Sequence, residues 1–509
     1  MTRARILLDL KPALDGYAGI PQESRLLFAG LRSLVDKYDI EGLLQHGSET
    51  LFAHILSKDT KLSPDEKLLQ HSKSVVSFYG SKRKGFPAKV KKEINKYFTI
   101  KRLLWQALKG KPLDLGLFEA NLFDDFIWSS FFSKTLNPTQ RHIVTTANHR
   151  VLRTSRRTLH EVGLRGFSRF HNPRYLSVDT RNYNFFIAHT PFPGRVSPGT
   201  NLVIRYHDAV PILMPHTIGD KAFHQASHYY ALRDNVESGA WFVCNSEATR
   251  GDLLKLFDVD SRTMVIPNIV SGDYFPEAST RTQALKVIQN RIHRETDKPF
   301  SKDVNLALVL QESNKSFDYL LMVSTLEPRK NHQLLVAAWE RLKYTSMPDL
   351  KLVVVGGQGW EYQPILQQLR PWIEQGELFH LSNVPSNELR VLYKHAAATI
   401  CPSVAEGFDY SGIEAMRCGG LVLASDIPVH REIYEDASVY FDPYDPGHAA
   451  EKISHLLGDV GRPEALSIKQ AAATVSGKYT PQNILPQWEE FFSRRIEAEK
   501  MSKLNIKGN

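Results

Sequence analysis

The stretch FDYLLMVSTL, residues 317–326, begins the pattern that decides the fold. It is an apolar run of strand length, and HQLLVAAWERL (332–342) follows it with helical spacing. LKLVVVGG (350–357) is a second apolar run, and it ends in two glycines. Strands of roughly 4–8 residues that alternate with helices predict repeated β-α-β units. Such units build a parallel sheet with helices on both faces.

The alternation continues through the C-terminal part and also occurs in the N-terminal part. An early strand is predicted at ARILLDL (4–10), and later apolar runs predict further strands at NFFIAHT, LVIRYHDAV, WFVCNS and TMVIPN. Between about residues 45 and 182 the pattern fails, and we expect a helical insertion there. The predicted fold class is therefore α/β, with two doubly wound, Rossmann-like domains.

The expected domains follow from these patterns. Residues 1–300 form an N-terminal domain that contains the insertion, and residues 317–480 form a C-terminal domain. The charged segment 277–316 is interpreted as the connection between them. Residues 481–509 are expected to form a helix and tail that cross back to the N-terminal domain. Doubly wound sheets bind ligands at the carboxyl ends of their strands, so two facing domains would bind a ligand in the cleft between them.

The composition is that of an ordinary globular protein, with 509 residues of which 42% are hydrophobic and 23% charged. The three cysteines form no C-x-x-C pair, which argues against a disulfide framework or a structural zinc site. The N-terminal apolar run is too short for a signal peptide, and no run of about 18 apolar residues is present. We expect a cytoplasmic protein that associates peripherally with the cytoplasmic membrane.

Two acids stand out in PSVAEGFDYSGIEAM (402–416), where seven residues separate Glu406 from Glu414. A strand ends just before this stretch, and a helix is expected to begin near Ser411. The free N–H groups of a helix N-terminus favour phosphate. Glu414 either stabilises the first helical turn or binds a ribose diol. Glu406 is either a solvated acid or a partner of sugar hydroxyls.

A basic turn precedes this stretch by about eighty residues. STLEPRKN (324–331) follows a strand and places Arg329 and Lys330 just before a helix. Two cations at the carboxyl end of a strand can neutralise a diphosphate. The alternative is a surface turn with solvated charges.

Together, STLEPRKNHQLL, EGFDYSGIEAM and ASDIPVHREIY resemble the retaining glycosyltransferases of the GT-B fold, specifically glycosyltransferase family four of the bacterial surface-polysaccharide type. The resemblance is good over residues 319–443, weaker over 184–268, and does not cover the insertion. The family's E-x7-E motif is matched by Glu406 and Glu414. The resemblance therefore implies two facing domains with a donor site between them.

The resemblance also implies roles for individual residues. It implies that Arg329 and Lys330 bind the donor diphosphate, that Glu406 lies by the transferred sugar, and that Glu414 holds the ribose. The base is expected to rest on the backbone near Val384. The remaining residues expected at the donor, around the helix N-terminus and in a facing glycine turn, are Phe408, Asp409, Tyr410, Ser411 and Gly19.

Two positions depart from the family pattern. Many members carry a further arginine where this chain has Thr325, which leaves one cation fewer for the phosphates. Many members have glycine after the phenylalanine of E-G-F, where this chain has Asp409. Its carboxylate either binds a hydroxyl of the donor sugar or caps the helix.

The N-terminal domain supplies two weaker signals. Gly16 and Gly19 in GYAGIPQESR permit a close backbone approach to a ligand, and a plain tight turn explains them equally well. His207 and Asp208 follow a strand and match an H-D motif of the family. His207 is either a structural histidine or a catalytic one that lies by the reacting sugar carbon or the acceptor.

The implied reaction moves a sugar from a nucleotide diphosphate to a hydroxyl and keeps the anomeric configuration. The leaving phosphate takes the proton of the acceptor, and the best candidate donor is GDP-mannose. No metal-binding acid cluster of the D-x-D kind lies near these motifs, and the resemblance implies metal-independent transfer, so we expect neither a metal ion nor another cofactor. The alternatives are another GT-B sugar-nucleotide enzyme, an epimerase or a phosphorylase, and a basic nucleic-acid-binding protein. No helix-turn-helix, zinc-finger or RNP-type motif is present, so we expect no nucleic-acid partner.

The net charge of +9 is concentrated in one segment. Residues 81–112 contain eleven Lys or Arg and one acid, which gives 11 − 1 = +10. Val90, Ile94, Tyr97, Leu104, Trp105 and Leu108 recur there at helical spacing. Residues 82–111 are therefore either a basic amphipathic helix that binds an anionic membrane or a helix packed on its own domain. The membrane alternative suits a lipid-linked glycan as acceptor.

Overall fold

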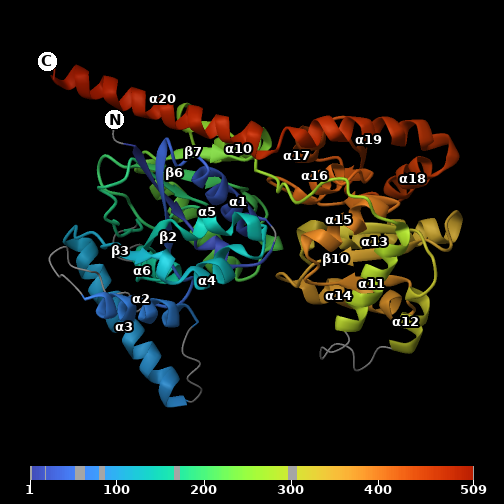
Figure 1. Ribbon diagram of the computed structural model, residues 1–509, viewed down its shortest axis with the longest axis horizontal. Helices are drawn as coiled ribbons and strands as arrows, with labels where there is room; N and C mark the ends of the chain where they lie inside the picture. The colour runs from blue at the N-terminus through green and yellow to red at the C-terminus, as the bar shows by residue number, and fades with distance from the viewer. Residues whose placement is uncertain are drawn as a thin grey trace. The chain divides into compact units, whose positions relative to one another are not determined.

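The computed structural model describes residues 3–17, 19–51, 63–79, 86–165, 172–295 and 306–507. The chain forms two compact units. Unit 1 comprises Met1–His207, Ala222–Cys244 and Leu253–Val265, and unit 2 comprises Asp208–Lys221, Asn245–Asp252 and Ile266–Asn509. Each unit is built around its own sheet, with helices packed beside it (Figure 1).

Within the described residues, the sheet of unit 1 has eight strands in the order β3-β4-β2-β1-β5-β6-β7-β8. All neighbouring pairs are parallel except β3 and β4. The strands are β1 (Ala4–Asp9), β2 (Tyr38–Leu44), β3 (Gly116–Glu119), β4 (Asn148–Val151), β5 (Phe185–Ala188), β6 (Asn201–Tyr206), β7 (Trp241–Cys244) and β8 (Thr263–Val265). The α-helices up to β8 are α1 (Ile20–Arg32), α2 (Pro64–Tyr79), α3 (Phe86–Leu108), α4 (Asp124–Ile127), α5 (Arg141–Thr145), α6 (Arg156–Arg165), α8 (Val210–Leu213), α9 (Lys221–Glu237) and α10 (Glu247–Leu256).

The sheet of unit 2, over the same described ranges, has six strands in the order β11-β10-β9-β12-β13-β14, all parallel. The strands are β9 (Tyr319–Val323), β10 (Lys351–Val355), β11 (Leu378–Leu381), β12 (Ala398–Cys401), β13 (Val422–Ser425) and β14 (Val439–Phe441). The helices are α11 (Arg281–Glu295), α12 (Leu306–Ser313), α13 (His332–Thr345), α14 (Tyr362–Glu374), α15 (Ser386–His395), α16 (Tyr410–Arg417), α17 (Pro428–Tyr434), α18 (Pro446–Leu457), α19 (Arg462–Gly477) and α20 (Pro481–Lys507).

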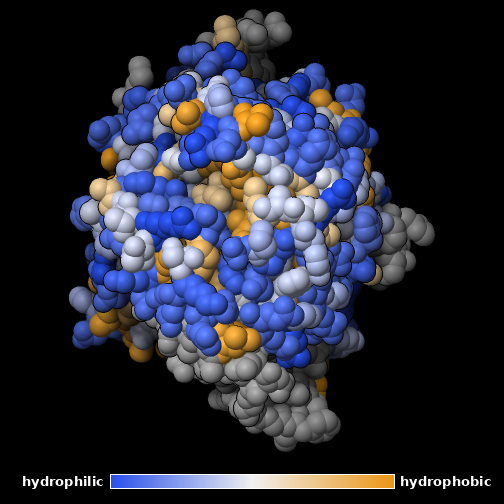
Figure 2. All heavy atoms as spheres, turned by 90° about the vertical axis from the view of Figure 1, so that its right-hand side faces the viewer, coloured by the Kyte–Doolittle hydropathy of each residue, from blue (hydrophilic) through white to orange (hydrophobic). Residues whose placement is uncertain are grey.

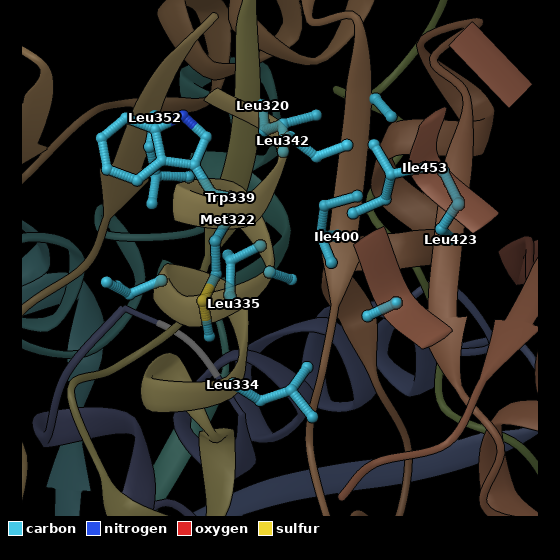
Figure 3. Close-up of a cluster of buried hydrophobic side chains, with 14 of the residues drawn as sticks. Leu320, Met322, Leu334, Leu335, Trp339, Leu342, Leu352, Ile400, Leu423 and Ile453 are labelled. Carbon is cyan, nitrogen blue, oxygen red and sulfur yellow. The ribbon is translucent and has the colours of Figure 1, made fainter. Parts of the chain in front are cut away.

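The core of unit 2 explains why the sequence pattern was so regular. Every residue of β10 is buried, and its valines suit a strand that is covered on both faces. Helix α13 packs its apolar side on the sheet through Trp339, Leu335 and neighbouring leucines (Figure 3). The indole of Trp339 donates to the carbonyl of Leu350 at 2.8 Å, so its buried N–H is satisfied.

The structure corrects two expectations about unit boundaries and insertions. The predicted helical insertion, about residues 45–182, also contributes strands β3 and β4, which extend the sheet of unit 1 beyond β2. The predicted connection, residues 277–316, contains α11 and α12 instead. Helix α11 packs against β11 and α15, so this helix belongs to the body of unit 2.

The three cysteines, Cys244, Cys401 and Cys418, are all buried, and none of them forms a disulfide bond. The face of the molecule shown in Figure 2 is mostly hydrophilic, with small scattered apolar areas. Of the helices in the described ranges, none combines the length and the apolar character needed to cross a membrane.

Candidate active site

The basic turn, residues 324–331, joins β9 to α13. Within it Asn331 adopts a left-handed backbone conformation, with φ at 59°, which asparagine tolerates better than most residues. Its side-chain amide donates to the carbonyl oxygens of Pro402 and Pro443, at 3.1 and 2.8 Å. These bonds fasten the basic turn to the segments that follow β12 and β14.

Arg329 and Lys330 of this turn both bind the carboxylate of Glu406. Arg329 Nη1 lies 2.7 Å from Glu406 Oε2, and Lys330 Nζ contacts Oε1. Arg329 also donates to the carbonyl of Ala405 at 3.2 Å and lies 3.2 Å from Glu327 Oε2. The structure thus brings the two motifs of the sequence into direct contact.

This cluster is largely shielded from water, because the side chain of Glu406 keeps only 4% of its exposure. Burial opposes the ionisation of Glu406, but Arg329 and Lys330 outweigh it, so the pKa of Glu406 lies below its ordinary value. Burial lowers the pKa of Arg329, but Glu406 and Glu327 raise it further, so it ends above the ordinary value. Glu406 therefore stays ionised at neutral pH between two cations.

Asp409 directly precedes α16 and caps it. Its Oδ1 accepts hydrogen bonds from Ser411 N at 3.2 Å and from Ser411 Oγ at 2.7 Å. An aspartate at this position satisfies a free N–H group and is favoured by the helix dipole. Of the two alternatives for Asp409, the cap is therefore observed, and a contact with a donor-sugar hydroxyl stays a prediction.

The other oxygen of Asp409 faces a buried histidine. His430 Nε2 lies 3.4 Å from Asp409 Oδ2, and His430 Nδ1 lies 2.9 Å from the carbonyl of Ser425. The hydroxyl of Tyr434 donates to the carbonyl of Asp409 at 3.1 Å. Burial opposes the ionisation of Asp409, but Lys330 and His430 lower its pKa well below the usual range. These contacts fix the backbone three residues after Glu406.

Glu414 has different partners from Glu406, although both belong to one motif. It is buried in α16, and Tyr393 Oη donates to its Oε2 at 3.1 Å. Tyr274 also makes a side-chain hydrogen bond to Glu414. Burial first, and the carboxylate of Glu414 second, raise the pKa of both tyrosines well above the ordinary value. Both hydroxyls therefore remain donors, and the predicted contact of Glu414 with a ribose stays a prediction.

Phe408 and Tyr410 are predicted donor residues whose side chains pack inside unit 2. Both residues are 7% exposed, and their rings meet edge to face with centroids 5.2 Å apart. Phe408 also meets Tyr479 at 5.3 Å. The two rings anchor the loop that carries Glu406. Because both side chains are buried, a contact of Phe408 or Tyr410 with a donor would be made by the backbone.

Val384 lies half-buried in the loop between β11 and α15, where the sequence predicts the base site. Arg291 of α11 supports this loop by donating to the carbonyl of Asn383 at 2.9 Å, and it also pairs with Glu388. Sequence reasoning missed Arg291, because a basic residue in a charged segment gives no signal of a contact about ninety positions away.

Gly19 of unit 1 begins α1 with φ at 70° and ψ at −136°, a conformation that only glycine adopts readily. The preceding turn is held by Arg25, which is fully buried and donates through Nη2 to the carbonyls of Ala13 and Gly16, each at 2.8 Å. Arg25 Nε donates to the carbonyl of Phe131 at 2.8 Å. Burial lowers the pKa of Arg25 to about 10, which still leaves it charged.

His207, also of unit 1, follows β6 and stacks on His189, which follows β5. The ring centroids are 5.8 Å apart, and the planes differ by 17°. Burial, and next the charge of Arg205, lower the pKa of both imidazoles, that of His189 to about 3. Both histidines are therefore neutral at physiological pH, and a catalytic role for His207 stays a prediction.

The arrangement in unit 2 suits an anionic ligand that carries hydroxyl groups. Two cations and a helix N-terminus lie at the carboxyl ends of parallel strands, and Glu406 adds a hydrogen-bond acceptor between the cations. In the part of the chain that the structure describes, no three His, Cys, Asp or Glu side chains are grouped to hold a metal ion. Metal independence stays a prediction.

Comparison with known proteins connects this geometry to chemistry. Residues 310–474 match the family described as "Glycosyl transferases group 1". The chain is 26% identical over 336 residues to the O-antigen chain mannosyltransferase B of Escherichia coli, which covers 65% of this chain and 78% of that protein. It is 36% identical over 139 residues to the serotype-specific mannosyltransferase WbdA of Escherichia coli, over 27% of this chain and 17% of that protein.

A solved structure shares the fold. The Anabaena protein HepE, determined in complex with UDP, superposes with a TM-score of 0.54 at 14% identity, over 96% of this chain and 100% of that chain. This likeness, with the two mainly parallel sheets, confirms the predicted α/β fold class of the GT-B type.

Proposed function

Because residues 310–474 form a glycosyl transferases group 1 domain, we propose that the protein is a retaining, metal-independent mannosyltransferase. It moves mannose from GDP-mannose to a hydroxyl of a lipid-linked glycan, at the cytoplasmic side of a membrane. The contact of Arg329 and Lys330 with Glu406 carries the proposal, since it combines phosphate-binding cations with a sugar-binding acid. The names of the two Escherichia coli relatives support mannose and a polysaccharide product.

In the proposed reaction the bond between the sugar C1 and the β-phosphate oxygen breaks, and a bond between C1 and the acceptor oxygen forms. The leaving phosphate takes the acceptor proton on the same face, which keeps the anomeric configuration. Arg329, Lys330 and the amides before α16 stabilise the charge that develops on the phosphate. Glu406 orients the sugar, Glu414 binds the ribose, and the backbone at Val384 receives the base.

Unit 1 provides the remaining groups in this proposal. The Gly19 turn offers backbone amides to the ligand, because glycine leaves no side chain in the way. His207 contributes a neutral imidazole, which either donates a hydrogen bond to a hydroxyl or accepts one from it. A neutral ring suits a contact with an uncharged sugar or acceptor better than with a phosphate.

The test is a calorimetric screen of the purified full chain against GDP, UDP, ADP and dTDP, each with and without EDTA. We expect GDP to bind tightest, with no effect of EDTA, and GDP-mannose to yield an α-linked product with a glycan acceptor, identified by NMR. Preference for another nucleotide would replace the donor. An epimerised nucleotide sugar with no transfer product would indicate a different reaction, and no binding at all would overturn the proposal.

A further inference from the structure

Helix α3 of the insertion has two apolar sides, of which one faces the protein. Ile100 and Leu103 are buried, with 0% and 2% exposure, and α3 packs against α6. Lys96 Nζ pairs with Glu161 of α6 at 2.8 Å. These contacts hold the C-terminal two thirds of α3 on unit 1 and fix which side of the helix points outward.

The other side of α3 exposes large apolar residues, and we call it the α3 outer face. Positions 94, 98, 105 and 108 recur at intervals of three, four or seven, so they share one side of the helix. The exposed members of the α3 outer face are Ile94 at 51%, Tyr97 at 47%, Phe98 at 64%, Trp105 at 57% and Leu108 at 57%. Scattered single apolar residues are normal on a surface, but a continuous stripe on one helix indicates a partner. The part of the predicted helix before Ile94 adds no side-chain evidence, because its side chains lie outside the described residues.

Positive charge accompanies this stripe. The sequence from Ile94 to Lys111 contains no Asp or Glu, and Lys101, Arg102 and Lys109 are exposed. Lys101 Nζ lies 4.5 Å from the ring centroid of Tyr97, and Lys109 Nζ lies 3.5 Å from that of Trp105. Aromatic rings beside lysines are typical of the boundary between lipid headgroups and acyl chains.

We propose that the α3 outer face docks onto an anionic lipid bilayer and lies in the plane of its interface. The stripe offers apolar and aromatic groups to the acyl boundary, and Lys101, Arg102 and Lys109 offer charge to the headgroup phosphates. A second copy of this chain fits less well, because a two-fold contact would set the lysines of one α3 against those of the other.

Helix α2 extends the apolar surface of the insertion without adding the charge. It exposes Leu68, Leu69, Val76 and Tyr79, with exposures between 47% and 67%. Its first turn carries the acids Asp65 and Glu66, so we assign the attraction to anionic lipid to α3 alone. In Figure 1 one end of α3 extends beyond the rest of unit 1.

The inference rests on the proposed function in one respect: a lipid-linked acceptor is what brings the enzyme to a membrane. The test uses the purified full chain and flotation with vesicles of phosphatidylcholine alone or with added phosphatidylglycerol. We expect binding only to the anionic vesicles, and weaker binding as salt is raised. Changing Lys101, Arg102 and Lys109 together to Gln should weaken binding about fivefold per charge, or roughly 100-fold in total.

A second variant tests the apolar part of the α3 outer face. Phe98→Ser with Trp105→Ser should abolish flotation, and brominated acyl chains should quench tryptophan fluorescence of the native chain but not of this variant. The matched control is Tyr344→Ser, since Tyr344 is 86% exposed on α13 of unit 2 and should leave flotation unchanged.

The outcomes separate this inference from the proposed function. GDP binding, measured by calorimetry, should be equal in the native chain and in both α3 variants. Absence of flotation by the native chain, flotation that the variants do not change, or self-association that the variants abolish would each overturn the docking inference. None of these results bears on donor binding, and a chain that floats but binds no nucleotide would overturn the transferase proposal alone.

Discussion

The candidate residues at the carboxyl ends of the two sheets differ in charge, although β1 of unit 1 also ends in a buried ion pair between Asp9 and Arg156. In unit 2 the strand ends bear buried charges, with Glu406 held between Arg329 and Lys330. In unit 1 the ends of β5 and β6 bear two stacked histidines that burial keeps neutral. Charge suits a diphosphate leaving group, and neutral hydrogen-bonding groups suit hydroxyls. In the proposed function, the charged groups of unit 2 therefore bind the donor diphosphate, and the histidines of unit 1 contact uncharged hydroxyls.

The largest effect on the transfer rate is expected at Glu406 of unit 2. Glu406→Gln should lower the transfer rate about 100- to 1,000-fold, because the sugar loses its anionic partner. GDP affinity should hold or rise, since Arg329 and Lys330 lose a competing carboxylate. Steady-state kinetics and calorimetry measure the two effects. Glu435→Gln, at a half-exposed acid paired with Lys478, is the control, and a parallel loss of GDP affinity would contradict the assigned role.

The next effect concerns the cations themselves. Lys330→Ala should weaken GDP binding about 10- to 100-fold, as expected for the loss of a charged hydrogen bond. Lys343→Ala, at the opposite end of α13 and paired with Glu377, provides a matched control that should leave GDP affinity unchanged. Equal affinity in the Lys330 variant would move the phosphate site away from the basic turn.

The third experiment compares how the stability of each unit depends on pH. The described histidines of unit 1 whose pKa values burial lowers are His71, His149, His160, His189, His207 and His228. Below about pH 6.5 the unfolded chain takes up protons that these folded sites refuse, so the free energy of unfolding falls by up to about 1.4 kcal/mol per pH unit for each.

In the described residues unit 2 has fewer such histidines, namely His332, whose pKa burial lowers to about 3, and His395, so it loses less stability over this pH range. The lowered pKa of Glu406 gives unit 2 further stability that is lost only as pH falls below about 4.5. Hydrogen exchange, corrected for intrinsic rates, should therefore show β5 and β6 losing protection between pH 7.5 and 5.5 before β12 does. Earlier loss in β12 would contradict the comparison.

The smallest effect is expected at His189. Neither ring nitrogen of this buried residue has a hydrogen-bond partner in the described part of the chain, so its contribution is the stacked ring. His189→Phe should keep the stack on His207, change transfer by less than about threefold and remove the acid sensitivity of this one site. Kinetics and acid unfolding measure both. A large fall in kcat would show instead that a His189 nitrogen contacts the reacting groups.

The fold of unit 2 was predictable because its signal is local. Each strand is a short apolar run and each helix has its own apolar periodicity, so α13 and β10 follow from their own residues. Strands β3 and β4 were missed because Gly116–Glu119 and Asn148–Val151 have no such pattern. They are strands because β4 pairs with β2, with Gly42 opposite His149, and β3 pairs with β4.

The sequence predicted the two motifs of the candidate site but not how their side chains contact one another. The sequence identified Arg329, Lys330 and Glu406, but their direct contact depends on a fold that joins positions more than seventy residues apart. The cap by Asp409 was one of two open alternatives; the hydrogen bonds to Ser411 show the cap, and the contact with a donor sugar stays a prediction. Arg291 could not be found, because its role exists only once α11 packs on unit 2.

The reactivity of two buried cysteines, Cys401 and Cys418, can report local opening of the candidate site. Burial raises the pKa of the Cys401 thiol well above its usual range and that of Cys418 to about 12, so neither is reactive while the fold is closed. Cys401 ends β12 just before the loop that carries Glu406 and Asp409, and Cys418 follows α16, the helix that begins after this loop. The rate at which the two thiols are alkylated therefore measures how often this region opens. A bound donor should lower that rate, and the measurement needs neither a label nor a substitution.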